Sequence, residues 1–169
     1  LNRPERYNAL SRELLGLLQV ELDRIKDDPG VRVVVITGTG RAFCAGHDLK
    51  EMRASPGQEA YEELFARCSR VMQSIVNLPV PIIARVHGIA TAAGCQLVAM
   101  CDLAIASHDA RFAVSGVNLG LFCSTPSVAL TRNLSRKAAF EMLETGEFIS
   151  ADDALMKGLL NRVADPQEL

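Results

Sequence analysis

Two segments of the chain share one arrangement, in which a run of apolar strand-forming residues is followed by a small-residue loop and then by a helical pattern. In the first, residues 33–37 lead into residues 43–50, and in the second, residues 82–86 lead into residues 88–96. Small residues let a ligand approach the backbone closely, and a helix that begins there directs unpaired N–H groups at it. Two such loops facing each other would form an anion site, although tight turns under packed helices would give the same pattern.

The rest of the chain follows an α/β pattern. Apolar residues at helical spacing predict a helix over residues 11–28 with Ser11 as its N-cap, and a β-branched run predicts a strand over residues 31–37 that is buried on both faces. Ser150 and Asp153 fit a capping box that starts a late helix. Further helices are expected within residues 58–77, 92–100 and 125–145, further strands within 81–86, 102–106 and 111–114, and no regular pattern within 41–52.

Length and composition limit the possible partners. The 169 residues suit one domain, residues 1–169, and the net charge of -2 offers no cationic track for nucleic acid. No apolar run is long enough to span a membrane. The five dispersed cysteines form no C-x-x-C pair, so we expect no disulfide framework, no metal site and a reducing compartment. Because Leu1 is not a start methionine and residues 1–4 read as a strand entering a turn, we expect the chain to be a fragment.

The wording of the two loops resembles the signature loops of the enoyl-CoA hydratase/isomerase (crotonase) superfamily. The first loop reads Phe-Cys-Ala-Gly-His-Asp-Leu-Lys over residues 43–50, and the second reads Gly-Ile-Ala-Thr-Ala-Ala-Gly-Cys-Gln over residues 88–96. Residues 1–10 and 146–163 resemble further segments of the same superfamily in the same order. The resemblance implies a crotonase-like α/β spiral of repeated ββα units, with the C-terminal helical part absent from this chain. Within the superfamily, the chain most resembles the enoyl-CoA hydratase domain-containing branch.

The same resemblance implies an acyl-CoA thioester as the ligand. It assigns the backbone N–H groups of His47 and Ala93 to an oxyanion hole for the thioester carbonyl, where preorganised donors stabilise an enolate. Ala93 replaces the usual glycine. The resemblance also implies that Ala45, Asp48 and Leu49 of the first loop bind the substrate. It places two cations, Lys50 and Arg6, near the coenzyme A moiety. Solvated surface roles for Lys50 and Arg6, and a loop-ordering role for Asp48, are alternatives.

Hydratases of this superfamily use two glutamates, and this chain has neither. Gln96 and Gly116 occupy those positions, and neither an amide nor a glycine can shuttle a proton near neutral pH. Gln96, the His47 ring or a water could assist instead, while His47 could also be merely structural. Cys123 precedes a predicted helix and is either a nucleophile or, as we expect, a buried structural thiol.

These observations predict an acyl-CoA-binding protein that stabilises a thioester enolate, with ordinary hydratase activity doubtful. The alternative is a non-catalytic acyl-CoA-binding or regulatory subunit. No cofactor is expected apart from coenzyme A as part of the substrate, and the resemblance implies a homo-trimer or hexamer. The expected compartment is the cytoplasm for a bacterial source and the mitochondrial matrix for a eukaryotic one.

Overall fold

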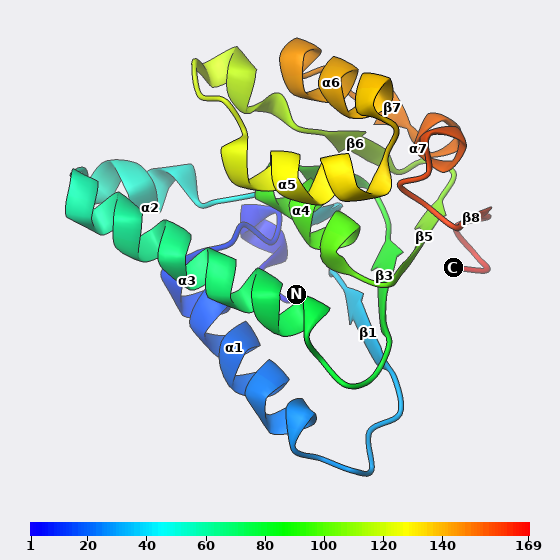
Figure 1. Cartoon of the computed structure of the whole chain (residues 1–169), viewed down its shortest axis with the longest axis horizontal. Helices are drawn as coiled ribbons and strands as arrows, with labels where there is room; N and C mark the ends of the chain where they lie inside the picture. The colour runs from blue at the N-terminus through cyan, green and yellow to red at the C-terminus, as the bar shows by residue number, and fades with distance from the viewer.

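The computed structural model describes all residues, 1–169, and contains seven α-helices and eight strands (Figure 1). The helices are α1 (Arg12–Lys26), α2 (Leu49–Ala54), α3 (Gln58–Val76), α4 (Ala93–Met100), α5 (Ser124–Asn133), α6 (Arg136–Thr145) and α7 (Ala151–Lys157). The strands are β1 (Val34–Thr37), β2 (Ala42–Cys44), β3 (Ile82–Val86), β4 (Ile89–Thr91), β5 (Leu103–Ser107), β6 (Arg111–Ala113), β7 (Ile149–Ser150) and β8 (Arg162–Ala164). Two 3₁₀ helices, η1 (Pro4–Arg6) and η2 (Ser115–Leu119), complete the set.

The strands form two four-stranded sheets that take alternate strands from the first six along the chain. One sheet has the order β1-β3-β5-β8 and is parallel throughout, and the other has the order β2-β4-β6-β7, in which only β7 runs antiparallel. Three successive pairs of strands, β1-β2, β3-β4 and β5-β6, each add one strand to each sheet, and a helix follows each pair. This is the predicted α/β arrangement of repeated ββα units.

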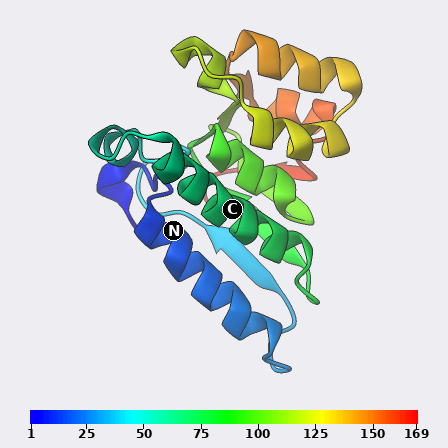
Figure 2. The ribbon, with the colours of Figure 1, turned by 60° about the vertical axis from the view of Figure 1, so that its left-hand side comes forward.

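The helices pack in a continuous series from α1 to α6. α1 contacts α3, α3 contacts α4, α4 contacts α5, and α5 contacts α6, as Figure 2 shows. Ser11 caps α1 as predicted, because its side chain accepts a hydrogen bond from the N–H of Leu14. α3 buries one face, spaced as an amphipathic helix requires: Leu64, Cys68, Val71, Met72 and Ile75. None of the helices is both long and apolar enough to cross a membrane.

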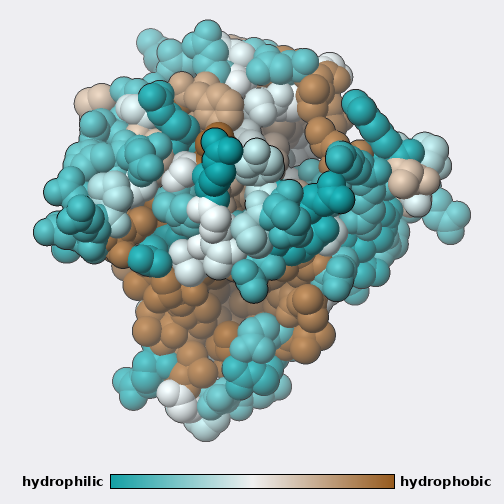
Figure 3. All heavy atoms as spheres, turned by 180° about the vertical axis from the view of Figure 1, so that it is seen from behind, coloured by the Kyte–Doolittle hydropathy of each residue, from teal (hydrophilic) through white to brown (hydrophobic).

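The strand predicted over residues 31–37 is not buried on both faces. Val33 and Val35 are 49% and 52% exposed, and Leu103 on β5 is 43% exposed. The helices cover only one face of the β1-β3-β5-β8 sheet, so alternate side chains on its other face meet solvent. Figure 3 shows a hydrophobic area on the side of the molecule opposite to that of Figure 1.

Residues 41–52 are more regular than the sequence pattern indicated. They contain β2 and the start of α2, and the second loop contains β4. β2 and β4 pair in parallel, with Cys44 opposite Ala90. This pairing brings the ends of the two predicted loops side by side, at one edge of the second sheet.

Candidate functional site

Both loops line one largely apolar cavity of about 300 Å³. The first loop contributes Ala45, His47 and Leu49, and the second contributes Ala92 and Ala93. The remaining wall comes from α2, α3, η2, the segment that leads into α5, and the first turn of α5. It consists of Met52, Phe65, Ser115, Gly116, Leu119, Leu121, Phe122, Cys123, Ser124, Thr125 and Pro126. Sequence reasoning missed most of these wall residues.

The two loops touch at Gly46. This residue has a φ of +86°, which favours glycine, and an added Cβ would lie 3.0 Å from the Cβ of Ala92 and 3.1 Å from the carbonyl oxygen of Thr91. A side chain at position 46 would therefore push the loops apart. The glycine keeps the backbone of residues 46–47 close to the start of α4.

The backbone N–H of His47 is unpaired. Two nearby backbone donors in the same loop are engaged: the N–H of Ala45 donates to the Tyr7 oxygen at 3.0 Å, and the N–H of Asp48 donates to the Leu10 oxygen at 3.4 Å. The N–H of His47 has no such backbone acceptor. His47 is also one of the residues that line the cavity.

Ala93 supplies a second unpaired donor. It is the first residue of α4, so its N–H has no acceptor within the helix, and the preceding residue provides no side-chain cap. That preceding residue, Ala92, has φ 51° and ψ -121°, an unfavourable conformation for a residue with a Cβ. Such a conformation persists only where the surrounding structure enforces it. Here it occurs at the start of α4, the helix whose N-terminus lies at the cavity.

The His47 side chain packs against α3. Its ring meets the Phe65 ring edge to face, with centroids 5.4 Å apart and an interplanar angle of 74°. The Nδ1 atom is buried without a hydrogen-bond partner. Burial lowers the pKa of the imidazole below its ordinary value, so the ring is neutral at neutral pH. A neutral imidazole can accept a proton, but the contacts of this ring are those of a side chain packed against Phe65.

The pKa of His47 leads to a prediction about stability. A lowered pKa in the folded state means that, as the pH falls through about 6.5, the unfolded chain takes up a proton that the folded chain refuses. Folding stability should therefore decline as pH falls from 7 to 5.5, and His47→Gln should reduce this decline. Urea unfolding at several pH values measures the difference. An equal decline in the wild type and in His47→Gln would contradict the prediction.

The two positions without glutamate differ in their surroundings. Gln96 is only 3% exposed, its side-chain oxygen has no partner, and it is not among the residues that line the cavity. Gly116 does line the cavity, and a Cβ there would lie 2.5 Å from the Leu121 oxygen and 2.6 Å from the Cys123 sulfur. The backbone around position 116 is therefore packed too closely for any side chain.

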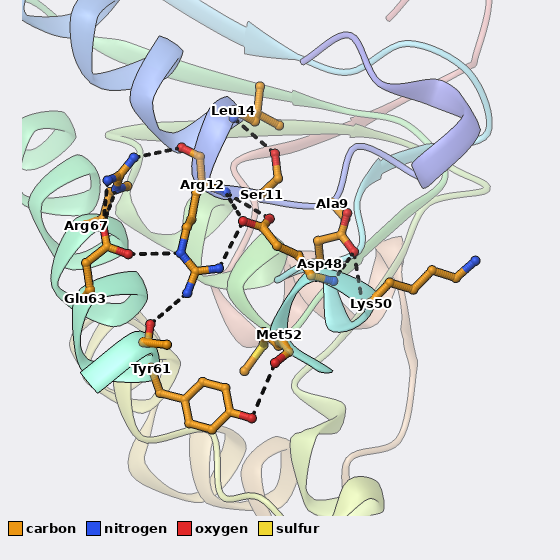
Figure 4. Close-up of polar contacts among 12 residues, drawn as sticks. Ala9, Ser11, Arg12, Leu14, Asp48, Lys50, Met52, Tyr61, Glu63 and Arg67 are labelled. Atoms are coloured by element: carbon orange, nitrogen blue, oxygen red, sulfur yellow. Dashed lines mark hydrogen bonds and ion pairs between the residues drawn. The ribbon is translucent and has the colours of Figure 1, made fainter. Parts of the chain in front are cut away.

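The residues expected near coenzyme A lie outside the cavity. Arg6 on η1 and Lys50 on α2 are exposed, and neither forms an ion pair; Figure 4 shows Lys50 extending away from the neighbouring polar contacts. Asp48 caps α2, accepting from the N–H groups of Lys50 and Glu51 at 3.2 Å, and pairs with Arg3 at 3.5 Å. These contacts correspond to the loop-ordering alternative for Asp48.

The cysteines are all buried and free of disulfides. Burial raises the pKa of Cys123, which favours the expected structural thiol over a nucleophile. No group of three or more His, Cys, Asp or Glu side chains is placed so that it could hold a metal ion.

Comparison with known proteins assigns the chain to a family. The model of the enoyl-CoA hydratase/isomerase family matches residues 1–169. The chain belongs to this family. Enoyl-CoA hydratase domain-containing protein 3, mitochondrial, from Xenopus laevis is 52% identical over the whole chain, and the human protein of that name is 51% identical. The chain spans 58% and 56% of the lengths of these two relatives.

Solved structures of the family share the fold. A crystal structure of an enoyl-CoA hydratase from Mycobacterium smegmatis superposes with a TM-score of 0.97 at 66% identity, covering 99% of this chain and 65% of that one. The crystal structure of human enoyl-CoA hydratase domain-containing protein 3 gives a TM-score of 0.94 at 50% identity, covering 99% and 68% of the two chains. Together these matches confirm the predicted crotonase-type fold and the predicted branch.

Proposed function

We propose that this member of the enoyl-CoA hydratase/isomerase family binds an acyl-CoA thioester whose carbonyl oxygen accepts hydrogen bonds from the N–H groups of His47 and Ala93. The proposal is supported by one observation: His47 and Ala93, whose backbone N–H groups are unpaired, both line one largely apolar cavity. A thioester enolate develops negative charge on that oxygen, and preorganised backbone donors in a water-poor site stabilise such charge. The family membership supports the same ligand class.

The acyl chain and the coenzyme A phosphates of the proposed ligand also have suitable residues nearby. Leu49, Met52, Phe65, Leu119 and Leu121 offer apolar contact to an acyl chain. Arg6 and Lys50 are unpaired cations on the surface, and they are the proposed partners of the coenzyme A phosphates. Coenzyme A enters only as part of the substrate in this proposal, and no separate cofactor is invoked.

The proposed chemistry stops short of ordinary hydration. Addition of water across a double bond needs a group that removes a proton and another that delivers one, and Gln96 and Gly116 can do neither. Enolate-based isomerisation, decarboxylation or thioester cleavage would then need Gln96, the His47 ring or a bound water as helper. The missing glutamates also favour a second candidate, a non-catalytic acyl-CoA-binding or regulatory subunit.

The proposal extends to the assembly and the compartment. The protein is proposed to form a homo-trimer or hexamer. It is assigned to the cytoplasm of a bacterial host or to the mitochondrial matrix of a eukaryotic one. The names of the vertebrate relatives as mitochondrial proteins support the second case.

Replacement of Ala93 by proline tests the proposed donor directly. Proline suits the first position of a helix and lacks the N–H, and its ring would occupy the donor's place. Because a proline also restricts the residue before it, and Ala92 has φ 51° and ψ -121°, the fold of the variant is checked first by circular dichroism. In titration calorimetry, Ala93→Pro should bind crotonyl-CoA at least about tenfold more weakly than the wild type, with affinity for free CoA unchanged. Arg136→Pro is the matched control, because Arg136 is the exposed first residue of α6 and lies outside the cavity.

Three outcomes separate the hypotheses. Wild-type binding of crotonyl-CoA without loss of its double-bond absorbance would support binding without hydration. Turnover of any acyl-CoA by the wild type would exclude the non-catalytic subunit. Equal crotonyl-CoA affinity in the wild type and a correctly folded Ala93→Pro variant would refute the role of the Ala93 N–H.

A further inference from the structure

α2 forms part of the cavity wall although it has little packing to hold it. The helix has six residues, none of which is fully buried, and a helix this short is unstable by itself. Its residues Leu49 and Met52 nevertheless line the cavity. Apart from the packing of Met52 against the hydrophobic core, contacts on the other side of α2 hold this wall in place.

Those contacts converge on Glu51, which lies between the two lining residues in the sequence of α2. Its carboxylate accepts hydrogen bonds from the Arg12 guanidinium at 3.0 Å and from the Arg12 backbone N–H at 3.1 Å. Arg12 is the first residue of α1, so the carboxylate also lies at the positive end of a 15-residue helix. The ion pair is partly shielded, since the two side chains are 22% and 30% exposed.

Arg12 is itself held by α3. Its guanidinium donates to the Ala60 oxygen at 2.8 Å and pairs with Glu63 at 3.0 Å, and Glu63 also binds Arg67 at 2.9 Å. These links fix the Arg12 side chain from α3, independently of Glu51. The only direct polar contact between α2 and α3 is a long one, at 3.5 Å, from the Tyr61 hydroxyl to the Met52 oxygen.

We propose that Arg12 and Glu51 form a latch that positions α2, and that this latch determines how tightly the cavity holds an acyl chain. The ligand class rests on the function proposed above. Glu51 does not touch the cavity, so it acts as a positioning residue through Leu49 and Met52. When Arg12 and Glu51 are paired, Leu49 and Met52 contact the acyl chain of the ligand. When the pair is broken, α2 can move away and water can enter the cavity.

Glu51→Ala is the test, and Glu63→Ala is its matched control. Both replace one glutamate that pairs with Arg12, but only the first detaches α2. In Glu51→Ala, amide hydrogen exchange over residues 49–54 should accelerate about tenfold, while exchange within α1 and α3 stays as in the wild type. In Glu63→Ala, exchange over residues 49–54 should be unchanged.

Calorimetric titration with free CoA and octanoyl-CoA gives the functional readout. The gain in affinity from CoA to octanoyl-CoA should shrink about tenfold in Glu51→Ala and be retained in Glu63→Ala. Because Lys50 also lies on α2, affinity for free CoA should fall in Glu51→Ala as well, but by a smaller factor than affinity for octanoyl-CoA. Unchanged exchange over residues 49–54 would overturn the latch, and so would an equal loss of affinity for both ligands. A wild type that binds octanoyl-CoA no better than CoA would instead refute the proposed function, and hydrogen exchange alone would then decide whether the latch exists.

Discussion

Gly94→Ala is expected to lower the free energy of unfolding by about 3 kcal/mol. A Cβ at position 94 would lie 2.1 Å from the backbone oxygen of Cys44 and 2.8 Å from its carbonyl carbon. Both sides of this contact are main chain, so neither can move without displacing β2 or the start of α4. The only relief is separation of the two loops, which would also move the N–H groups of His47 and Ala93 apart.

Urea unfolding measures this loss, and Gly16→Ala provides the control. Gly16 lies within α1, where a Cβ would meet only the Arg67 side chain at 3.8 Å. Alanine favours the helix there, so the control should be more stable than the wild type by about 0.5–1 kcal/mol. A Gly94→Ala protein as stable as the wild type would show that β2 and α4 are not in the close contact described.

Gly116→Glu, which introduces the missing glutamate, is expected to cost about 3 kcal/mol of stability and to give no hydratase. The new Cβ would overlap the Leu121 oxygen and the Cys123 sulfur, so the segment before α5 would have to move. That segment forms much of the cavity wall. The double variant Gln96→Glu/Gly116→Glu should therefore hydrate crotonyl-CoA no faster than the wild type in an absorbance assay.

Gly120→Glu is the matched control for this substitution. It adds the same charge four residues further along, where a Cβ would meet no atom within 4 Å, and carries only the strain of a φ of +74°. Its stability loss should be limited to about 1 kcal/mol. A folded double variant with rapid crotonyl-CoA hydration would show that the cavity can admit a carboxylate at position 116.

The parts of the fold that depend on local signals were predictable from sequence. Ser11 and Ser150 cap the helices they were expected to cap, and Asp153 completes the capping box. The small residues of the two loops likewise indicated where the backbone would approach itself closely, as it does at Gly46. The helix caps depend on residues that are close in sequence, and the close approach at Gly46 depends on a residue type, glycine, that readily adopts a positive φ.

The parts that depend on distant pairing were not predictable from the residue pattern. β2 and β4 have three residues each, too few for an alternating pattern, and they exist because they pair with each other. A β-branched run looks the same whether one or both faces are covered, which explains the error at Val33 and Val35. Phe65 and the residues around Leu121 joined the cavity only because α3 and the segment before α5 fold over it.

The alternation of strands between two sheets has a consequence for how the chain folds. Val34 pairs with Ile82, and Ile105 pairs with Arg162, so neither end of the first sheet can close until distant parts of the chain have met. The entropy of closing such loops must be lost before the pairing compensates for it, which places folding times on the order of milliseconds to seconds. During synthesis β5 therefore keeps an unpaired edge until residues 162–164 emerge, and this edge is the surface a chaperone would need to shield.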